Sequence, residues 1–398
     1  MLGVGRRVAY MPLPSIELSM IVKDGGASLD RCLRSVAGLV DRIVVGDTGS
    51  TDDSIAIARR YGAEVFSIPW VDDFAAARNR VLEAARCDWV LVLDADEMLD
   101  PGEAAEQLPA LLREKEFHAY TLPRWDYVDQ LYGKQATQQA LVNPGSLAET
   151  RAYPGYRVSF HTRLFRRNPG VFFRECVHEQ VTDQIDLLGL ARKTASLTIH
   201  HLGYVETPDA AKEEKIRFYH RLGSRKALDE PANFEANLQL GIAELFQLGR
   251  PAEALTFLLR AGEVRPQDGR APLYAGICML RLDRLAPAKA SLMRAYALGE
   301  RGAILCDALG DCFLRLGEYE GALAAYREAH ERGNASPIAD AKLGAAEVHA
   351  GHAETGLERI RGALRRAPEA IEIAELLKIS ERALASAVPA CPTGMAAC

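Results

Sequence analysis

The chain has 398 residues, enough for two or three domains with their own hydrophobic cores. Hydrophobic residues make up 48% and charged residues 26%, which is typical of a globular protein. The net charge of −6 argues against nucleic acid as the main partner, because phosphate binding needs a basic surface. No apolar run approaches the roughly 20 residues of a membrane span, and the N-terminus lacks the apolar stretch of a signal peptide.

The eight cysteines favour free thiols over a disulfide framework. None belongs to a CxxC pair, and most lie inside apolar patterns, as Cys278, Cys306 and Cys312 do. Buried free thiols are typical of a reducing compartment, so we expect a cytoplasmic protein. Cys391 and Cys398 lie in a Pro/Ala-rich tail that we predict to be disordered.

Strand-like and helical patterns alternate from residue 18 to 116. The apolar runs LSMIV, RIVVGD, EVFSI and WVLVLD are separated by amphipathic stretches. Continuous apolar strands in such an alternation predict a parallel sheet covered on both faces. Ligands bind beyond the carboxyl ends of these strands, and Asp47, Asp94 and Asp96 fall there.

The middle of the chain, residues 117–205, is less regular. It holds short β-like runs such as HAYTLPRW, SFHTRLFRR and SLTIHHLGY, with Gly and Pro between them. We expect this part to complete the same domain with an antiparallel edge. A charged amphipathic stretch that follows, ETPDAAKEEKIRFYHRLGSRKAL, predicts a helix that joins the two halves.

The last part of the chain repeats with a period of about 34 residues. Small residues recur at Gly241, Gly276, Gly310 and Gly344, and larger residues recur at Leu258, Leu292, Tyr326 and Ile360. This period and this order resemble the tetratricopeptide repeat, which stacks helix pairs into a solenoid with a concave binding face. A plain helical bundle, the alternative, would not need a fixed period.

These patterns predict four segments. Residues 1–205 form a Rossmann-like α/β domain, 206–232 a linking helix, 233–370 an all-α repeat solenoid, and 371–398 a terminal helix and tail.

The pair Asp94-Ala95-Asp96 follows the fourth strand and suits a hard cation. Mg²⁺ or Mn²⁺ takes few protein carboxylates and completes its shell with water and substrate phosphates. A lone DxD is a weak signal, because acidic turns after strands are common.

The order of motifs strengthens this signal. LSMIVKD, DRIVVGDTGSTDDS, DFAAARN and WVLVLDADE follow one another along the first hundred residues. This set resembles the family-two glycosyltransferases with a GT-A fold, and YRVSFHTRLFRR, FRECVHEQV and HHLGY extend the resemblance. The pairing with repeats is similar to bacterial enzymes that glycosylate peptides, including bacteriocin S-glycosyltransferases. The resemblance implies an inverting, metal-dependent enzyme that uses a UDP-sugar.

The resemblance also assigns nucleotide contacts. Asp47 would accept a hydrogen bond from uracil N3–H; helix capping is the alternative, although Ser50 and Thr51 can serve that purpose. Asp94 would reach the ribose beside Ala95, and Asp96 the metal. Backbone groups from Val22 to Asp24 would line the nucleotide, although Gly25 and Gly26 depart from the family's usual Asn-Glu-Glu-like stretch. Arg78 would meet the base or the diphosphate, or be an exposed helical arginine, and Glu97 would only orient the turn.

The general base comes from the segment Cys176-Val-His-Glu-Gln180 in this comparison. Glu179 is the candidate base, and a surface carboxylate is the alternative. If Val177 and Glu179 alternate on a strand, His178 points the other way. Arg163 would pair with phosphate or only with Glu179, and His178 is a further candidate for contact with the acceptor or the diphosphate.

One of two adjacent histidines is a further candidate ligand. His200 and His201 would face opposite sides of a strand, so at most one reaches the metal or the diphosphate. We favour His201, with a structural histidine as the alternative.

The leading interpretation is sugar transfer from a UDP-sugar to a peptide or protein that the repeats hold, although the repeats could instead pair two subunits. A saccharide or lipid-linked acceptor and a non-catalytic scaffold with a degenerate transferase head are the alternatives. A dinucleotide-dependent dehydrogenase is disfavoured, because no GxGxxG follows the first strand.

Overall fold

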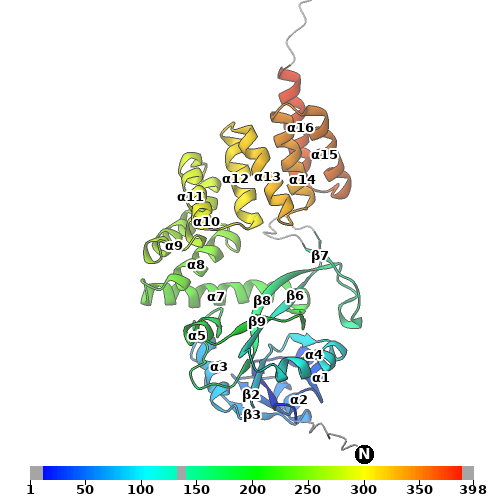
Figure 1. The fold of residues 1–398 in the computed structure, drawn as a ribbon, viewed down its shortest axis with the longest axis vertical. Coiled ribbons are helices and arrows are strands. Elements are labelled where there is room, and N and C mark those ends of the chain that lie inside the picture. The colour runs from blue at the N-terminus through cyan, green and yellow to red at the C-terminus, as the bar shows by residue number, and fades with distance from the viewer. Residues whose placement is uncertain (1–11, 132–139, 388–398) are drawn as a thin grey trace, which may run out of the picture. The chain divides into compact units, whose positions relative to one another are not determined.

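The computed structural model describes residues 12–131 and 140–387. They form two compact units: the first holds residues 12–129 and 141–222, and the second holds residues 130–131, 140 and 223–387 (Figure 1). The tail with Cys391 and Cys398 lies outside the described residues. Among the helices that are described, none combines the length and the apolar character needed to cross a membrane.

One mixed sheet forms the centre of the first unit. Its strands are β1 (Ile16–Val22), β2 (Arg42–Asp47), β3 (Glu64–Ser67), β4 (Trp89–Val92), β5 (Glu97–Leu99), β6 (Ala119–Val128), β7 (Leu141–Val142), β8 (Gly155–Arg166), β9 (Arg192–Thr194) and β10 (Ile199–His201). The strand order is β3-β2-β1-β4-β8-β6-β10-β5, with β7 beside β8 and β9 beside β6. β1 to β4 pair in parallel, as the alternating pattern predicts.

Helices cover both faces of this sheet. They are α1 (Gly26–Val36), α2 (Ser54–Arg60), α3 (Phe74–Glu83), α4 (Pro101–Arg113), α5 (Thr182–Leu187) and the short α6 (Gly203–Glu206), with a 3-10 turn at Ala148–Thr150. The next helix, α7 (Asp209–Asp229), runs across the division between the two units at residues 222 and 223. The side chains of α1, α2 and α4 share a core with Leu18 and Leu91. On the opposite face, α5 packs with Val90 and α3 with Val44. Because both faces are buried, the parallel strands carry unbroken apolar runs.

The antiparallel pairing is central as well as peripheral, which the sequence did not predict. The long strands β6 and β8 pair with each other, and β8 also pairs with β4 in the middle of the sheet. At one edge, β5 runs antiparallel to β10. As a result, the polar side chains of β6 and β8 lie close to the end of β4.

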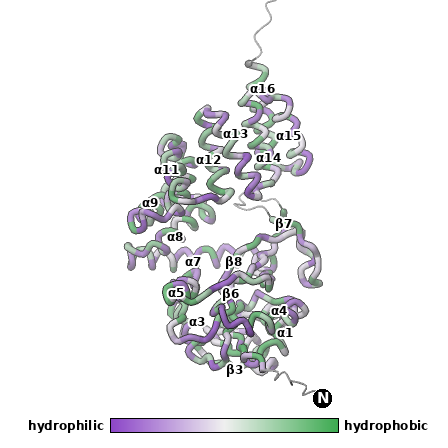
Figure 2. Tube along the Cα trace, viewed as in Figure 1, coloured by the Kyte–Doolittle hydropathy of each residue, from purple (hydrophilic) through white to green (hydrophobic). Residues whose placement is uncertain are grey.

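The second unit is a stack of helix pairs. Its helices are α8 (Phe234–Phe246), α9 (Pro251–Val264), α10 (Arg270–Arg281), α11 (Leu285–Ala297), α12 (Ala303–Arg315), α13 (Tyr319–Glu331), α14 (Pro337–His349), α15 (Ala353–Arg366) and α16 (Ile371–Ala387). The first helix of each pair contacts the first helix of the next, so α8, α10, α12 and α14 form one row. Figure 2 shows hydrophilic and hydrophobic stretches alternating along these helices, as one-sided burial requires.

Close contacts explain the periodic small residues. A Cβ added to Gly276 would lie 2.7 Å from the Leu292 side chain, and one added to Gly241 would lie 2.6 Å from Leu258. The same relation holds between Gly344 and Ile360, at 2.8 Å. The small residue thus lets the two helices of a pair approach, and the larger residue fills the space beside it. The predicted fold class, an α/β domain followed by a tetratricopeptide-like solenoid, is confirmed.

We predict that Gly276→Ala destabilises the second unit by about 1–3 kcal/mol, because the added methyl group overpacks the contact with Leu292. Urea unfolding of the full chain, followed by circular dichroism, measures this change. Gly302→Ala is the matched control, since its added Cβ meets nothing within 4 Å. An equal free energy of unfolding for both variants would contradict this packing account.

Candidate active site

The site begins where β4 ends. Residues 89–93 are fully buried, and the chain then turns so that β5 folds back against β10. The turn is closed by two hydrogen bonds: the Asp94 amide donates to Glu97 Oε2 at 2.9 Å, and the Glu97 amide donates to the Asp94 carbonyl at 3.0 Å. The strand therefore presents Asp94 and Asp96 at the carboxyl edge of the sheet.

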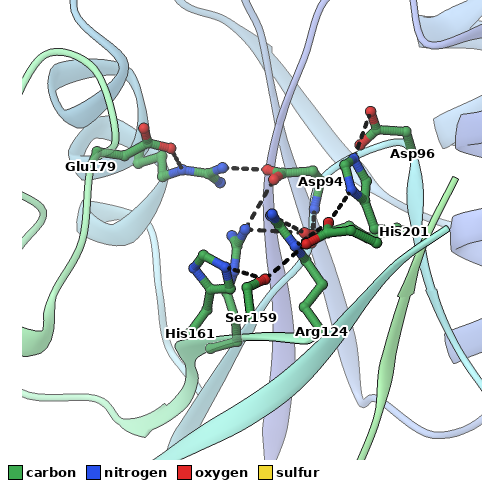
Figure 3. Close-up of polar contacts among 11 residues, drawn as sticks. Asp94, Asp96, Arg124, Ser159, His161, Glu179 and His201 are labelled. Carbon is green, nitrogen blue, oxygen red and sulfur yellow. Dashed lines mark hydrogen bonds and ion pairs between the residues drawn. The ribbon is translucent and has the colours of Figure 1, made fainter. Parts of the chain in front are cut away.

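Arg78 on α3 connects two parts of the site. The helix begins after Asp73, whose side chain accepts from the Ala76 amide at 2.9 Å. The Arg78 guanidinium pairs with Asp94, and its Nε donates to Glu179 Oε1 at 2.6 Å (Figure 3). Arg78 is only 4% exposed. It is therefore a buried link between two carboxylates and not the exposed helical arginine that the sequence left open.

A second arginine, Arg163 on β8, pairs with two of the acidic side chains. Arg163 Nη2 donates to Asp94 Oδ2 at 3.0 Å and to Glu97 Oε1 at 3.1 Å. Burial raises the pKa of Asp94, but Arg163 and Arg78 outweigh it and hold that pKa well below its usual value.

Glu97 lies deeper than Asp94. Arg124 Nη1 donates to its carboxylate at 3.3 Å. Burial raises the pKa of Glu97 and Arg163 opposes this effect, with a net rise. Glu97 therefore has a second role besides shaping the turn: it accepts from the Asp94 amide and also pairs with the arginines of β6 and β8.

The structure places His201, and not His200, beside Asp96. His201 Nε2 lies 3.4 Å from Asp96 Oδ2, and its Nδ1 lies 2.6 Å from Asp126 Oδ1. Burial lowers the pKa of His201, but the hydrogen bonds to Asp126 and Asp96 outweigh it and raise that pKa to about 9. His200 faces elsewhere, with Nδ1 2.8 Å from the Tyr127 hydroxyl.

Gly203 makes the approach of Asp96 to His201 possible. An added Cβ would collide with the Asp96 carboxylate and lie 2.6 Å from His201 Nε2. The Leu202 amide also donates to the Asp96 carbonyl at 3.1 Å. The segment that follows β10 is thereby fixed against the DxD turn.

The nucleotide candidates lie at the ends of β1 and β2. The buried Asp47 carboxylate accepts from the amides of Gly49 at 3.2 Å and Ser50 at 3.1 Å. Asp24 has a left-handed φ of 50°, and its Oδ1 accepts from the Thr51 amide at 2.6 Å. The Val22 carbonyl accepts from the Thr48 amide at 2.9 Å.

The expected capping by Ser50 and Thr51 is wrong. Helix α2 begins only at Ser54, after Asp53, and neither hydroxyl caps it. The Ser50 hydroxyl instead accepts from the Asp24 amide at 3.0 Å. Ser50 and Thr51 thus connect the loops after β1 and β2. The Asp47 carboxylate stabilises the loop that follows it, through the amides of Gly49 and Ser50.

The segment 176–180 is a loop, so its expected alternation as a strand is wrong. A single bridge between Arg174 and Gln180 closes it, and His178 adopts a φ of 59°. The loop turns Glu179 inward to Arg78 and leaves His178 exposed. The alternative pairing of Arg163 with Glu179 does not form, because Arg163 binds Asp94 and Glu97 instead.

An aromatic cluster connects the middle of α7 to α3 near the site. The Phe74 ring lies 4.8 Å from Trp70 and 5.6 Å from Tyr219, measured between centroids, and Phe218 joins this cluster. Burial and then the charges of Asp94 and Glu179 raise the pKa of Tyr219. The Tyr219 hydroxyl therefore stays protonated near these carboxylates.

The residues fit a divalent cation with two protein ligands. Within residues 12–131 and 140–387, no group of three or more His, Cys, Asp or Glu side chains is arranged to hold a metal. Asp96 and His201 converge, however, and the Asp126 contact orients the imidazole as carboxylates orient metal-binding histidines. Mg²⁺ and Mn²⁺ commonly keep water and substrate phosphates as their other ligands.

Sequence reasoning missed three residues of this site: Arg124, Asp126 and Gly203. The run TLPRWDYV placed Arg124 and Asp126 two residues apart in an apolar strand, and therefore on one face. Charged residues at that spacing in a buried strand were the available signal. Gly203 directly follows HHL, where a glycine can mark a close approach.

Parts of the sequence match a known family and several known proteins. Residues 19–172 match the model of the family described as "Glycosyl transferase family 2". A TPR repeat-containing protein of Synechococcus elongatus is 37% identical over 198 residues, covering 48% of this chain and 43% of the relative. The prophage-derived glycosyltransferase SunS of Bacillus subtilis is 26% identical over 250 residues, covering 62% and 53%. The chain thus spans about half the length of the curated relatives that it matches.

Two solved repeat proteins align with part of the chain. The TPR protein YrrB, described as having an unusual peptide-binding site, aligns with a TM-score of 0.35 and 15% identity, covering 42% of this chain and 84% of its own. MamA aligns with a TM-score of 0.35 and 20% identity, covering 46% and 91%.

We predict that Gly203→Ala weakens Mn²⁺ binding about 10- to 100-fold, because the new methyl group forces Asp96 and His201 apart. Titration of Mn²⁺ followed by electron paramagnetic resonance measures the affinity. Gly302→Ala is again the control. If both variants bind Mn²⁺ like the wild type, Asp96 and His201 are not its ligands.

We also predict a pH-dependent metal affinity. The pKa of His201 near 9 means that the imidazole is protonated at neutral pH, and a metal must displace that proton. The affinity for Mn²⁺ should therefore rise about tenfold per pH unit from about pH 6 to pH 8. Calorimetry in buffers of different ionisation enthalpy should record one proton released per ion. His201→Asn should bind more weakly and lose this release; proton release that persists in this variant would exclude His201.

Proposed function

We propose that the chain transfers a sugar from a UDP-sugar to a polypeptide with inversion at the anomeric carbon. The match of residues 19–172 to glycosyl transferase family 2 supports this proposal. The observation that supports it best is the convergence of Asp94, Asp96 and Glu179 at one edge of the sheet. Arg78 joins the first and the last of these carboxylates.

Glu179 is the proposed base. Its Oε1 accepts from Arg78, and Figure 3 shows no contact drawn to the second oxygen. That oxygen takes the proton of the acceptor hydroxyl or thiol, while the acceptor atom bonds to the anomeric carbon. The bond from that carbon to the diphosphate oxygen breaks, and UDP leaves with the electron pair. A divalent cation held by Asp96 and His201 would supply charge neutralisation for the leaving diphosphate.

The nucleotide is proposed to lie along the ends of β2, β1 and β4. Asp47 is fixed by two amides and keeps lone pairs for the uracil N3–H, since a carboxylate offers about four acceptor positions. Val22 and Asp24 flank it with backbone groups. Asp94 and Ala95 would contact the ribose, where the two arginines fix the Asp94 carboxylate.

The acceptor is proposed to be a polypeptide that the repeats bind. The row of first helices carries polar groups that connect neighbouring pairs: Lys342 on α14 reaches Asp307 at 2.7 Å and Asp311 at 2.9 Å on α12. Every group proposed for the chemistry belongs to the first unit, so the repeats are free to serve recognition.

We predict that Glu179→Gln lowers kcat about 10²- to 10⁴-fold, because the amide cannot take the proton. UDP affinity should stay within about twofold, since the amide oxygen can still accept from Arg78. A thiol acceptor would reduce the loss, because cysteine ionises more readily than a hydroxyl. Steady-state kinetics and calorimetry with UDP measure the two quantities.

Glu83→Gln is the matched control for this variant, since Glu83 lies exposed at the end of α3 and pairs only with Arg80 in the described chain. Equal losses in UDP affinity and in rate would assign Glu179 to nucleotide binding and remove it as the base.

We predict that a chain ending at Asp229 still releases UDP slowly from UDP-sugar but no longer labels protein. The reason is that the acceptor would lose its binding surface while the donor site stays complete. Incubation with radiolabelled UDP-sugar and a cell extract measures both products. Undiminished protein labelling by the shortened chain would mean that the repeats do not hold the acceptor.

A further inference from the structure

His161 lies on β8 between two residues of the site. Ser159 and His161 lie two residues apart on the strand and share one face, and Arg163 follows as the extra residue of a β-bulge opposite Tyr120 and Thr121. Arg163 holds Asp94 at 3.0 Å, and Ser159 donates to Asp126 Oδ2 at 2.9 Å. With about 3.3 Å per residue along a strand, His161 lies roughly 7 Å from each of these neighbours along the chain. It is partly exposed and belongs to the site face of the sheet.

The hydrogen bonds fix which nitrogen of His161 carries the proton. The Ser159 hydroxyl donates its one proton to Asp126 Oδ2, 2.9 Å away. The Ser159 oxygen must then accept from His161 Nε2, 3.1 Å away. Nδ1 therefore keeps its lone pair.

The imidazole also remains neutral. Burial and then the charges of Arg124 and Arg163 lower the pKa of His161 to about 3. Across the described residues, no hydrogen bond reaches Nδ1, and Figure 3 shows this nitrogen turned away from Ser159. His161 thus offers a fixed neutral acceptor, whereas Arg78, Arg124 and Arg163 offer donors that the carboxylates already use.

We propose that His161 is a specificity-determining residue whose Nδ1 accepts a hydrogen bond from a hydroxyl group of the donor sugar. This inference rests on the proposed function. An acceptor nitrogen needs a ligand with a donor group. Diphosphate has none, and the uracil N3–H would be taken by Asp47 on β2.

The strand order places the sugar near His161. In the sheet, β1 and β4 separate β2 from β8. Three strand spacings of about 4.8 Å give roughly 14 Å from the uracil side to β8. A nucleotide that starts at Asp47 and passes Asp94 therefore brings its sugar toward the strand that carries His161.

Two isosteric variants separate the acceptor role from the structural role. In His161→Gln the amide nitrogen can replace Nε2 and keep the bond to Ser159, but the Nδ1 acceptor is lost. In His161→Asn the amide oxygen can replace Nδ1, while the bond to Ser159 is lost. The parent donor is the one that the wild type hydrolyses fastest among UDP-glucose, UDP-galactose and their N-acetylamino analogues. Each variant is then assayed with this donor and with its monodeoxy analogues.

We expect the wild type to lose about tenfold in kcat/KM on one monodeoxy donor, the value of one neutral hydrogen bond. The kcat/KM of His161→Gln on the parent donor should be about tenfold below that of the wild type. On the monodeoxy analogue its kcat/KM should fall no further, because the substitution and the missing hydroxyl remove the same contact. His161→Asn should keep the discrimination. Nitrogen-15 NMR of the full-length protein should record the Nε2–H tautomer near neutral pH.

The inference is overturned if His161→Gln discriminates among the donors as the wild type does, or if the Nδ1–H tautomer is found. Loss of activity in His161→Asn alone would assign His161 to holding Ser159 and would also overturn it. These results leave the proposed function intact. If the wild type releases UDP from none of the donors, the proposed function itself fails.

Discussion

The ion pairs of Arg78 are the interaction on which the rest of the site depends. A guanidinium that is 4% exposed must have anionic partners, because burying an unpaired charge is far more costly than burying a paired one. Arg78 finds them in Asp94, at the end of a core strand, and in Glu179, on a loop 85 residues further along the chain. Removing either carboxylate would leave a buried charge without full compensation, at a cost of about 3–5 kcal/mol.

This requirement explains why an apolar strand runs directly into acidic residues. The partly exposed Asp94 and the buried Glu97 pair with Arg78, Arg124 and Arg163, which come from a helix and from two long antiparallel strands. The arginines keep Asp94 ionised and fixed. Asp96 contacts a different residue, His201, and the missing side chain of Gly203 leaves room for this contact. The two carboxylates of the DxD turn therefore have different surroundings, which suits different roles at one ligand.

The sequence predicted what depends on local periodicity. The parallel strands, the helix pairs with their small and large residues, and the acidic turn at the sheet edge all follow from patterns within a few tens of residues. The partners of Arg163 could not be predicted in this way, because they depend on the pairing of β8 with β4. The same holds for Asp126, which meets His201 only after β10 pairs with β6. The Glu179 loop has a left-handed residue, His178, that strand alternation does not foresee.

The most direct test of the central claim is release of UDP from a panel of UDP-sugars by the purified full-length chain. The account predicts that at least one UDP-sugar is hydrolysed when Mn²⁺ or Mg²⁺ is present, and that a chelator stops the release. Such a result would mean that the paired carboxylates, the histidine and the buried arginines work together on a nucleoside diphosphate. If no UDP-sugar is hydrolysed, or if the chelator leaves the rate unchanged, the metal-dependent transfer proposed for this site is contradicted.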